Sequence, residues 1–237
     1  MSLLTTLPAL PLKLPNIRAC VFDAYGTLFD VSSAAEQSQD VLGEEWRPLA
    51  DMWRNKQLQY TWLRSLNGQH ADFWEVTGNA LDFALESFQL EDPQLRERLM
   101  GLYLRLHAYP EVDAALTALK ASGIHTAILS NGSSAMLASA VNNAGIGHLL
   151  DAVLSVDDVK VFKPHPSVYQ LAVDRFGVRP DEICFVSSNG WDAYSAKAFG
   201  FRVVWCNRFA QAAERIPTTP DGEIVSLAEL IAIVGAT

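Results

Sequence analysis

The sequence lacks the features by which proteins commonly bind nucleic acid or enter membranes. Its 237 residues carry 18 Lys and Arg against 27 Asp and Glu, which gives a formal net charge of −9. A chain this acidic is a poor ligand for nucleic acid or for an anionic membrane surface. No apolar stretch approaches the roughly 18–20 residues that a membrane-spanning helix needs. We therefore expect neither nucleic-acid nor membrane partners.

Cysteine is scarce, which argues against a disulfide-stabilised secreted protein. The three cysteines, Cys20, Cys184 and Cys206, are odd in number and lie in apolar, strand-like runs. This pattern is typical of buried free thiols in a reducing compartment. Residues 1–16 hold three prolines and no basic residue before Lys13, whereas a secretory signal begins with positive charge and continues as an unbroken apolar run. We expect an irregular N-terminal tail there, and a cytoplasmic protein.

Two common cofactor motifs are also missing. The five histidines show no His-Glu-x-x-His sequence and no other paired spacing that would suit zinc. No Gly-x-Gly-x-x-Gly sequence follows the first apolar run, so the usual dinucleotide-binding fingerprint is absent from that position. These absences argue against zinc and against a dinucleotide, and we expect no cofactor.

Short apolar runs that alternate with helical segments predict the fold class. Five runs are continuously apolar, as strands are when both of their faces are buried. Except in the first gap, one helix-sized segment separates successive runs, which is typical of an α/β protein with a doubly wound parallel sheet. The predicted strands are 17–22, 125–129, 152–156, 182–186 and 202–206, with 223–225 as a candidate sixth. Helices are predicted over 112–122, 133–144 and 166–176, where Gly or Ser marks their ends.

The long gap after the first strand predicts a second domain. Between residues 33 and 109 no run resembles a strand, and aromatic-rich segments with helical spacing cover 49–65 and 72–88. A third helix is expected after the capping pair Asp92-Pro93, up to about 107. About 75 residues are too many for a crossover connection. We therefore expect a helical cap over 33–109, inserted into an α/β core made of 17–32 and 110–237.

Reactive side chains follow four of the predicted strands. The carboxyl ends of parallel strands converge on one crevice, so these side chains are expected to share one site. An Asp, a Ser, a Lys and a second Asp can supply a nucleophile, an anion donor, a cation and a base. In chain order the four residues are Asp23, Ser130, Lys163 and Asp192.

The segments around these residues form a recognisable set. They are Asp23-Ala24-Tyr25-Gly26-Thr27, Ser130-Asn131-Gly132, Lys163-Pro164 and Ser187-Ser188-Asn189-Gly190-Trp191-Asp192, with Met52-Trp53-Arg54-Asn55-Lys56-Gln57-Leu58 in the insert. In this order they resemble the motifs of the haloacid dehalogenase superfamily, and most closely those of its L-2-haloacid dehalogenases. The resemblance covers nearly the whole core and implies that family's α/β fold with a helical cap.

The role of Asp23 decides the chemistry. An Asp after a strand often only caps a loop, but Lys163 and Ser130 at the same end of the sheet favour a catalytic role. A carboxylate is a competent nucleophile, and a nearby ammonium keeps it ionised at neutral pH. The resemblance implies the same, with Asp23 as nucleophile, Lys163 beside it, and Asp192 activating water with help from Asn189.

Tyr25, two residues after Asp23, separates two chemistries. Phosphatases of the superfamily carry a second Asp at this position to protonate an alkoxide, whereas a phenol with a pKa of about 10 is a poor acid at pH 7. A halide leaves as a stable anion and needs no proton. The same phosphatases place an acidic residue near Ser187 or Ser188, and here only Asp23 and Asp192 remain as charged ligands for Mg²⁺. We expect a metal-free site.

Three residues are implicated in binding the halide. Arg54 could be a solvated residue of an amphipathic helix, but it shares a helical face with Leu58, which turns its guanidinium toward apolar surface. The resemblance implies that Arg54 faces the crevice and binds halide together with Asn131 and Trp191. Preorganised donors of this kind stabilise a leaving anion.

The resemblance implies supporting roles for further residues, although each could equally be a packing or loop residue. Ser130, with N–H groups at the start of the helix near Ser133, is expected to bind the substrate carboxylate. Asp157-Asp158 is expected to be a solvated turn, and Gly190 departs from the family, where Ala would be usual. Residues expected to orient the charged groups are Ser187, Asn189, Thr27 and Tyr169, and those expected to form an apolar wall are Tyr25, Leu58 and Phe73.

Together these features predict hydrolytic dehalogenation of (S)-2-haloacids to (R)-2-hydroxy acids. Asp23 would attack C2 opposite the halogen, which inverts C2 and forms an ester, and Asp192 would activate the water that hydrolyses this ester. The expected partners are a small-molecule 2-haloacid and water, and the resemblance also implies a homodimer. Three alternatives stay open: a small-molecule phosphatase of the same superfamily, a hydrolase of another 2-substituted carboxylic acid, and a catalytically silent binding protein.

Overall fold

The computed structural model describes residues 12–31 and 39–235. Its centre is a six-stranded sheet in the order β3-β2-β1-β4-β5-β6, and every neighbouring pair is parallel. The strands are β1 Ala19–Phe22, β2 His125–Ser130, β3 Ala152–Ser155, β4 Ile183–Ser187, β5 Arg202–Cys206 and β6 Gly222–Ile224. All six predicted strands are therefore confirmed, with shifts of one or two residues at their ends. The strand order reverses at β1, which is where open α/β sheets form their binding crevice.

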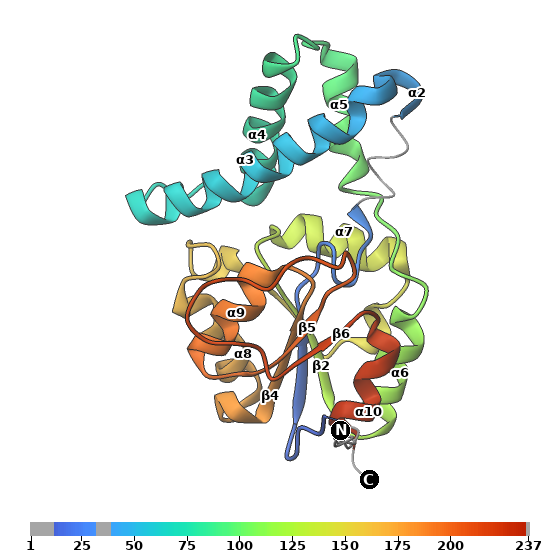
Figure 1. Ribbon diagram of the computed structural model, residues 1–237, viewed down its shortest axis with the longest axis vertical. Coiled ribbons are helices and arrows are strands. Elements are labelled where there is room, and N and C mark those ends of the chain that lie inside the picture. Colours follow the sequence, from blue (N-terminus) through green and yellow to red (C-terminus); the bar gives the residue numbers. More distant parts are fainter. Residues whose placement is uncertain (1–11, 32–38, 236–237) are drawn as a thin grey trace, which may run out of the picture.

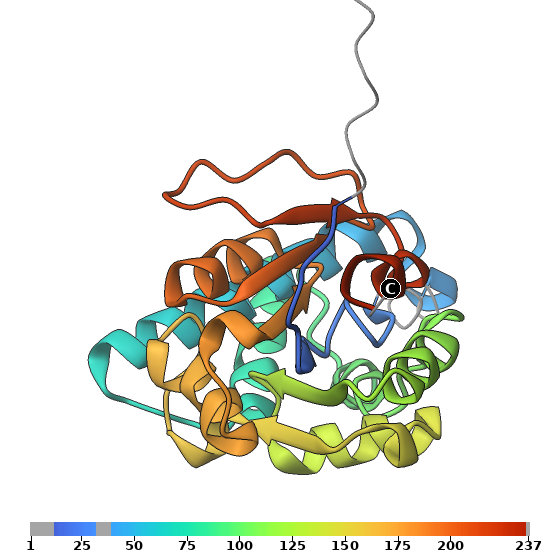
Figure 2. The same ribbon diagram turned by 90° about the horizontal axis from the view of Figure 1, so that it is seen from below.

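Helices cover both faces of the sheet (Figure 1). One face carries α6 and α10, and the other carries α8 and α9, as the view from below also shows (Figure 2). The core helices are α6 Val112–Ala121, α7 Ser134–Ala144, α8 Pro166–Phe176, α9 Gly190–Phe199 and α10 Leu230–Val234. This layering confirms the predicted doubly wound α/β fold.

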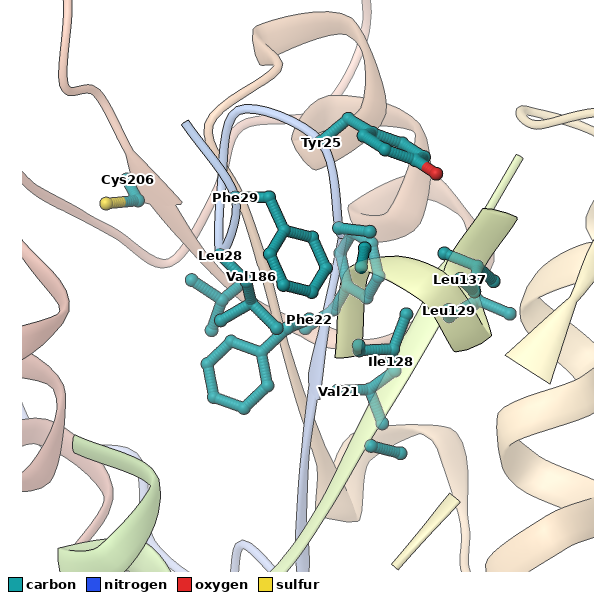
Figure 3. Packing of buried hydrophobic residues seen from close by; sticks show 14 of the residues in the cluster. Val21, Phe22, Tyr25, Leu28, Phe29, Ile128, Leu129, Leu137, Val186 and Cys206 are labelled. Carbon is teal, nitrogen blue, oxygen red and sulfur yellow. The ribbon is translucent and has the colours of Figure 1, made fainter. Parts of the chain in front are cut away.

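The central strand β1 is buried along its whole length, which explains its continuous apolar sequence. Phe22 pairs with Ile128 on one side and with Val186 on the other, and Figure 3 shows these side chains in one packed cluster. Cys20 faces Cys184 across the same ladder, and both are buried free thiols, as is Cys206.

The insert consists of helices that stand above the carboxyl ends of the strands (Figure 1). They are the short α2 Gln39–Leu42 and the longer α3 Trp46–Asn67, α4 Phe73–Ser87 and α5 Pro93–Leu102; we refer to α3, α4 and α5 as the cap. Asp72 begins α4 by accepting a hydrogen bond from Glu75 N, and Asp92 begins α5 in the same way from Gln94 N. None of the described helices is long and apolar enough to span a bilayer.

The third insert helix is shorter than the sequence suggests. It ends at Leu102, whereas the helical spacing predicted an end near 107. The cause is long-range pairing: Asp30 N donates to His107 O, and Tyr109 N donates to Leu28 O, at 2.9 Å each. This pairing needs extended backbone on the returning segment.

Two predictions fall partly outside the described residues. Residues 1–11 belong to the predicted N-terminal tail, and residues 32–38 span the predicted boundary at 33 between core and cap. Within the described part of the tail, Leu14 is buried and its N–H donates to Ile233 O. The domain limits at 33 and 109 stay a prediction.

Candidate active site

The buried ammonium of Lys163 lies between two carboxylates. Its Nζ is 3.1 Å from Asp23 Oδ1 and 2.8 Å from Asp192 Oδ2. Burial alone would lower the pKa of Lys163, but the charges of Asp192 and Asp23 outweigh burial and raise it. Burial raises the pKa of Asp192, while Lys163 opposes this rise. Lys163 is therefore positively charged at neutral pH and compensates two carboxylates at once.

Asp23 is held by the end of the sheet and by a tight loop. Its N–H donates to Val186 O and so extends the β1–β4 ladder by one residue. The loop that follows turns at Gly26, whose φ of 85° is open to glycine but rarely adopted by other residues. The N–H groups of Leu28 and Phe29 then both donate to Ala24 O. These bonds aim the Asp23 carboxylate into the crevice above the strand ends.

The second oxygen of Asp23 is also fully engaged. Asn189 Nδ2 donates to Asp23 Oδ2 at 2.7 Å, and Thr27 Oγ1 donates to the same atom at 3.3 Å. Thr27 Oγ1 in turn accepts from Ser188 N, and Ser187 Oγ accepts from Asn189 N. The predicted supporting residues therefore do surround Asp23, as a chain of donors that restrict its rotation.

Asp192 is held from both sides by donors. Tyr169 donates its hydroxyl to Oδ1 at 2.8 Å, and Lys163 donates to Oδ2. Burial raises the pKa of Tyr169 well above its ordinary value, so the phenol stays protonated and remains a donor. Asp192 is a fully buried acceptor, which is the environment expected of a general base.

Arg54 connects the cap to this centre. It lies on α3, and its guanidinium donates to Asn189 Oδ1. Because the Asn189 amide nitrogen donates to Asp23, one side chain bridges the cap cation and the core carboxylate. The structure thus brings Arg54 to the crevice, and it is not a freely solvated helix residue. Leu58, one turn further on, lines the same cleft.

At the start of α7, more of the polar groups already have hydrogen-bond partners within the protein than the sequence suggests. Asn131 Oδ1 accepts from Lys163 N at 2.9 Å, and Ser130 Oγ accepts from Gly132 N at 3.1 Å. Of the helix N–H groups, Met136 N donates to Ser133 Oγ, and Ser134 N donates to Asp157 Oδ2. Asp157 is therefore the anion at this helix terminus. It lies with the exposed Asp158 in a short 3-10 turn, as predicted, but its bond to Ser134 was not foreseen.

Aromatic residues close the crevice from the cap side. The Tyr25 ring stacks on Phe73 at 6.1 Å between ring centres and lies 5.9 Å from Tyr103. Figure 3 shows Tyr25 at the rim of the buried cluster, above Phe29. Burial raises the pKa of Tyr25 far above its ordinary value, so its hydroxyl cannot release a proton near neutral pH. Tyr103 was not anticipated as a site residue, because no motif in the sequence singles it out from the rest of its predicted helix.

Three buried donors of the site have no partner among the residues that the structure describes. They are the Tyr25 hydroxyl, the Ser188 hydroxyl and the Trp191 indole N–H. Trp191 packs edge-on against Trp62 of α3, with ring centres 5.6 Å apart. A buried N–H or O–H without a partner costs about 1–3 kcal/mol. The site therefore favours a ligand that accepts hydrogen bonds.

A cleft of about 710 Å³ separates the cap from the strand ends. Cap and core both contribute to its walls, including Trp46, Arg47, Arg54, Leu58, Tyr103, Ser188, Asn189, Trp191, Phe209 and Glu214. At Gly190, a Cβ would lie 3.0 Å from Oε1 of the exposed Glu214 side chain, which is free to move aside. Phe209 and Glu214 were missed by sequence reasoning because they belong to an irregular loop without a motif.

The charged groups of the site are arranged around a lysine. Within residues 12–31 and 39–235, no group of three or more His, Cys, Asp or Glu side chains is placed to hold a metal ion. The two carboxylates that could serve as ligands instead share the ammonium of Lys163. Their positive partner is thus supplied by the chain itself.

Comparison with known proteins places this geometry in a family. A family model described as haloacid dehalogenase-like hydrolase matches residues 17–200. (S)-2-haloacid dehalogenase 1 of Pseudomonas sp. (strain CBS-3) is 49% identical over 90% of this chain and 95% of its own. (S)-2-haloacid dehalogenase 4A of Burkholderia cepacia is 47% identical, over 91% and 94%.

A solved structure agrees with these sequences. The L-2-haloacid dehalogenase from Xanthobacter autotrophicus with chloropropionic acid covalently bound has a TM-score of 0.84 and is 39% identical, over 90% of this chain and 96% of that one. The fold, the order of the motifs and the shared length all agree, so the resemblance noted from the sequence is confirmed. The chain belongs to the haloacid dehalogenase-like hydrolases, in the group of the (S)-2-haloacid dehalogenases.

Proposed function

We propose that this protein hydrolyses the carbon–halogen bond of (S)-2-haloacids and releases (R)-2-hydroxy acids. The observation that carries the proposal is the pair formed by Asp23 and Tyr25. A well-oriented carboxylate, paired with the Lys163 ammonium, faces the crevice, and a phenol that stays protonated occupies the position of the phosphatases' acid. This combination suits a leaving group that needs no proton. The relatives named (S)-2-haloacid dehalogenase support the same substrate class.

In the first step, an Asp23 oxygen attacks C2 of the haloacid on the side opposite the halogen. A C–O bond forms, and the C–halogen bond breaks with its electron pair leaving as halide, so the configuration at C2 inverts. Lys163, Asn189 and Thr27 keep the carboxylate oriented through their hydrogen bonds. The product of this step is an ester on Asp23, in keeping with the relative that holds chloropropionic acid covalently.

Arg54, Asn131 and Trp191 are proposed to receive the halide. Arg54 reaches the core at Asn189, and Trp191 has a buried N–H without a partner among the described residues. Asn131 Oδ1 accepts a hydrogen bond from Lys163 N. This bond orients the Asn131 side chain and leaves its amide nitrogen available for another acceptor. Fixed donors in a water-poor site stabilise a developing anion more than solvent does. Leu58, Phe73 and Tyr25 form the apolar wall beside them.

In the second step, Asp192 takes a proton from a water molecule, and the resulting hydroxide adds to Cγ of the Asp23 ester. The bond between Cγ and the ester oxygen on C2 then breaks, that oxygen takes the proton held by Asp192, and the 2-hydroxy acid leaves while Asp23 keeps a solvent oxygen. Tyr169 and Lys163 hold Asp192 in place for this role. Ser130 is proposed to bind the substrate carboxylate; Ser134 N, which is already bonded to Asp157, does not contribute.

We further propose a cytoplasmic homodimer with the predicted division into core and cap. Three buried free thiols support a reducing compartment. Apolar side chains exposed on α3 and α4 support a dimer contact there: Trp62, Leu63, Leu66 and Phe83. Sedimentation analysis of the protein and of Leu66→Glu tests the dimer: we expect a dimer for the protein and a monomer for the variant, and we expect the variant to fold because Leu66 is 82% exposed.

The test of the proposed function is halide release from a panel of 2-haloacids, both enantiomers of each, beside a generic phosphate ester with Mg²⁺. We expect release from (S)-substrates only and a product of (R) configuration. Turnover of the phosphate ester without halide release would assign the protein to the phosphatases of its family instead.

A further inference from the structure

Arg208, just beyond β5, has three partners on two distant segments of the chain. Its side chain is only 9% exposed. One terminal nitrogen donates to Glu111 Oε1 at 2.6 Å, and the other donates to the backbone oxygen of Thr27 at 3.0 Å. The guanidinium also lies 3.9 Å above the centre of the Tyr109 ring. A buried arginine with an ion pair, a backbone bond and a ring contact is tightly held.

The segments that it joins are the two connectors between core and cap. Thr27 lies in the loop that carries Asp23, shortly before the chain leaves for the cap. Tyr109 and Glu111 lie where the chain returns, at the start of α6. The two connectors pair directly, since Tyr109 N donates to Leu28 O. Arg208 therefore holds the outgoing and the returning connector together from the core side.

The ion pair is charged at neutral pH. Burial alone would raise the pKa of Glu111, but backbone hydrogen bonds and Arg208 lower it below its ordinary value. Removal of either partner would leave a partly buried charge without compensation. The contacts also require a guanidinium: its planar fork bonds Glu111 and Thr27 at once while its face lies on Tyr109, whereas a lysine ammonium is a point charge.

A short path leads from Arg208 to the reacting carboxylate. Arg208 binds the backbone oxygen of Thr27, and the Thr27 hydroxyl donates to Asp23 Oδ2. The same hydroxyl accepts from Ser188 N, so Thr27 links the nucleophile loop to the end of β4. Arg208 does not touch Asp23; it holds the residue that does.

We propose that Arg208 is a positioning residue of the dehalogenation site, one that sets the orientation of Asp23 through Thr27 and couples it to the two connectors between core and cap. The inference rests on the proposed function. A misplaced nucleophile loses rate without losing ground-state binding of the substrate, because near-attack geometry tolerates only small shifts. The loss should therefore fall on ester formation and leave KM nearly unchanged.

The test compares Arg208→Lys with Arg202→Lys. Arg202 lies on β5 and pairs with Asp221 at 3.2 Å, away from the nucleophile loop, so it is a matched control. With enzyme in excess over (S)-2-chloropropionate, we expect Arg208→Lys to slow ester formation at least ten-fold and Arg202→Lys to have no effect. Equal rates in the two variants would overturn the proposal.

A double variant tests the path through Thr27. If Arg208 acts through Thr27, Arg208→Lys combined with Thr27→Val should slow ester formation no more than Thr27→Val alone. If the rate losses of the two single variants multiply in the double variant, the proposed path is overturned. If Arg208→Lys does not fold, Glu111→Gln keeps the shape of the pair and removes its charge, and the same ten-fold criterion applies to it.

One readout does not depend on the reaction. Amide hydrogen exchange at Gly26, Leu28 and Phe29, whose N–H groups are bonded within the loop, should speed up in Arg208→Lys and not in Arg202→Lys. If exchange at these three amides is unchanged in Arg208→Lys, the positioning role is overturned, whether or not the protein turns over haloacids. If exchange is faster but the protein turns over no haloacid, the positioning role stands and the proposed function is wrong.

Discussion

Arg54 on cap helix α3 donates a hydrogen bond to the side-chain oxygen of Asn189, 135 residues further along the chain. The amide nitrogen of Asn189 donates to Asp23 Oδ2, so a single amide group joins the cap cation to the core nucleophile. Under the proposed mechanism, in which Arg54 receives the halide, one continuous hydrogen-bonded chain would organise both attack on carbon and departure of halide. A cap displaced from the core would break this chain at its first bond.

The first prediction concerns this cation. We expect Arg54→Ala to slow ester formation by 10²–10³-fold, because losing one preorganised donor to a developing anion costs about 3–4 kcal/mol in the transition state. The control is Arg47→Ala, an exposed arginine of the same helix that also lines the cleft. Rapid-quench measurement of halide release compares the two. Near-normal release from Arg54→Ala would show that the bond to Asn189 has no role in catalysis.

The second prediction concerns pH. Burial raises the pKa of Asp192, and only its ionised form can accept a proton from water, so hydrolysis of the ester should fail as pH falls through this raised pKa. The failure should begin at a higher pH than the ordinary Asp value of 3.8. The pKa of Lys163 is raised above 10.5, so its charge, and the stability that this charge contributes, should be lost only as pH rises beyond that value.

Single-turnover measurements over a range of pH separate the two steps, and thermal unfolding midpoints follow the stability. Lys163→Met is the control for the high-pH range. In that variant, the fall of the unfolding midpoint that is due to deprotonation of Lys163 should be absent. A rate of ester hydrolysis that stays constant down to pH 3.8 would contradict the assignment of Asp192 as the base.

The third prediction concerns metal. Because Lys163 supplies the positive charge between Asp23 and Asp192, activity should survive excess EDTA and gain nothing from added Mg²⁺. The measurement is halide release after extensive dialysis against EDTA, with and without Mg²⁺. A strict requirement for Mg²⁺, together with turnover of phosphate esters, would contradict both the metal-free site and the proposed substrate class.

The parts that the sequence could predict are those in which the local pattern and the physical cause coincide. Strands buried on both faces must be apolar throughout, so β1 and β4 are visible as runs such as Ala19–Phe22 and Ile183–Ser187. The location of the site can be predicted from these strands, because reactive residues at the carboxyl ends of parallel strands meet in one crevice. Asp23, Lys163 and Asp192 were therefore expected together, and they lie within hydrogen-bond distance of one another through Lys163.

The parts that could not be predicted depend on contacts between distant residues. The end of α5 at Leu102 is set by the pairing of Tyr109 with Leu28, which no helical spacing reveals. Arg208 reaches residues 97 and 181 positions away, and Asp157 binds Ser134 from 23 positions away. Such bonds leave no periodicity in the sequence, since each is made once and at an arbitrary separation.

The last prediction concerns which atom attacks carbon. If Asp23 is the nucleophile, the first turnover in H₂¹⁸O with enzyme in excess should give a 2-hydroxy acid that carries mostly ¹⁶O, because the product oxygen comes from the Asp23 carboxylate. The peptide that contains Asp23 should then carry one ¹⁸O in place of one ¹⁶O. If water attacked C2 directly, with Asp23 as a base, the product hydroxyl would be fully ¹⁸O and the peptide unlabelled.

Asp192→Asn sharpens this test. The variant retains the nucleophile and removes the base, so the ester should form and then hydrolyse slowly. Mass spectrometry should find the Asp23 peptide heavier by the mass of the substrate minus that of the hydrogen halide. Asp23→Asn is the matched control: it replaces the carboxylate by an amide of the same shape, and it should show neither turnover nor trapped mass. A trapped ester on any other residue, or none in Asp192→Asn while halide is still released, would refute the covalent mechanism even if the substrate class were right.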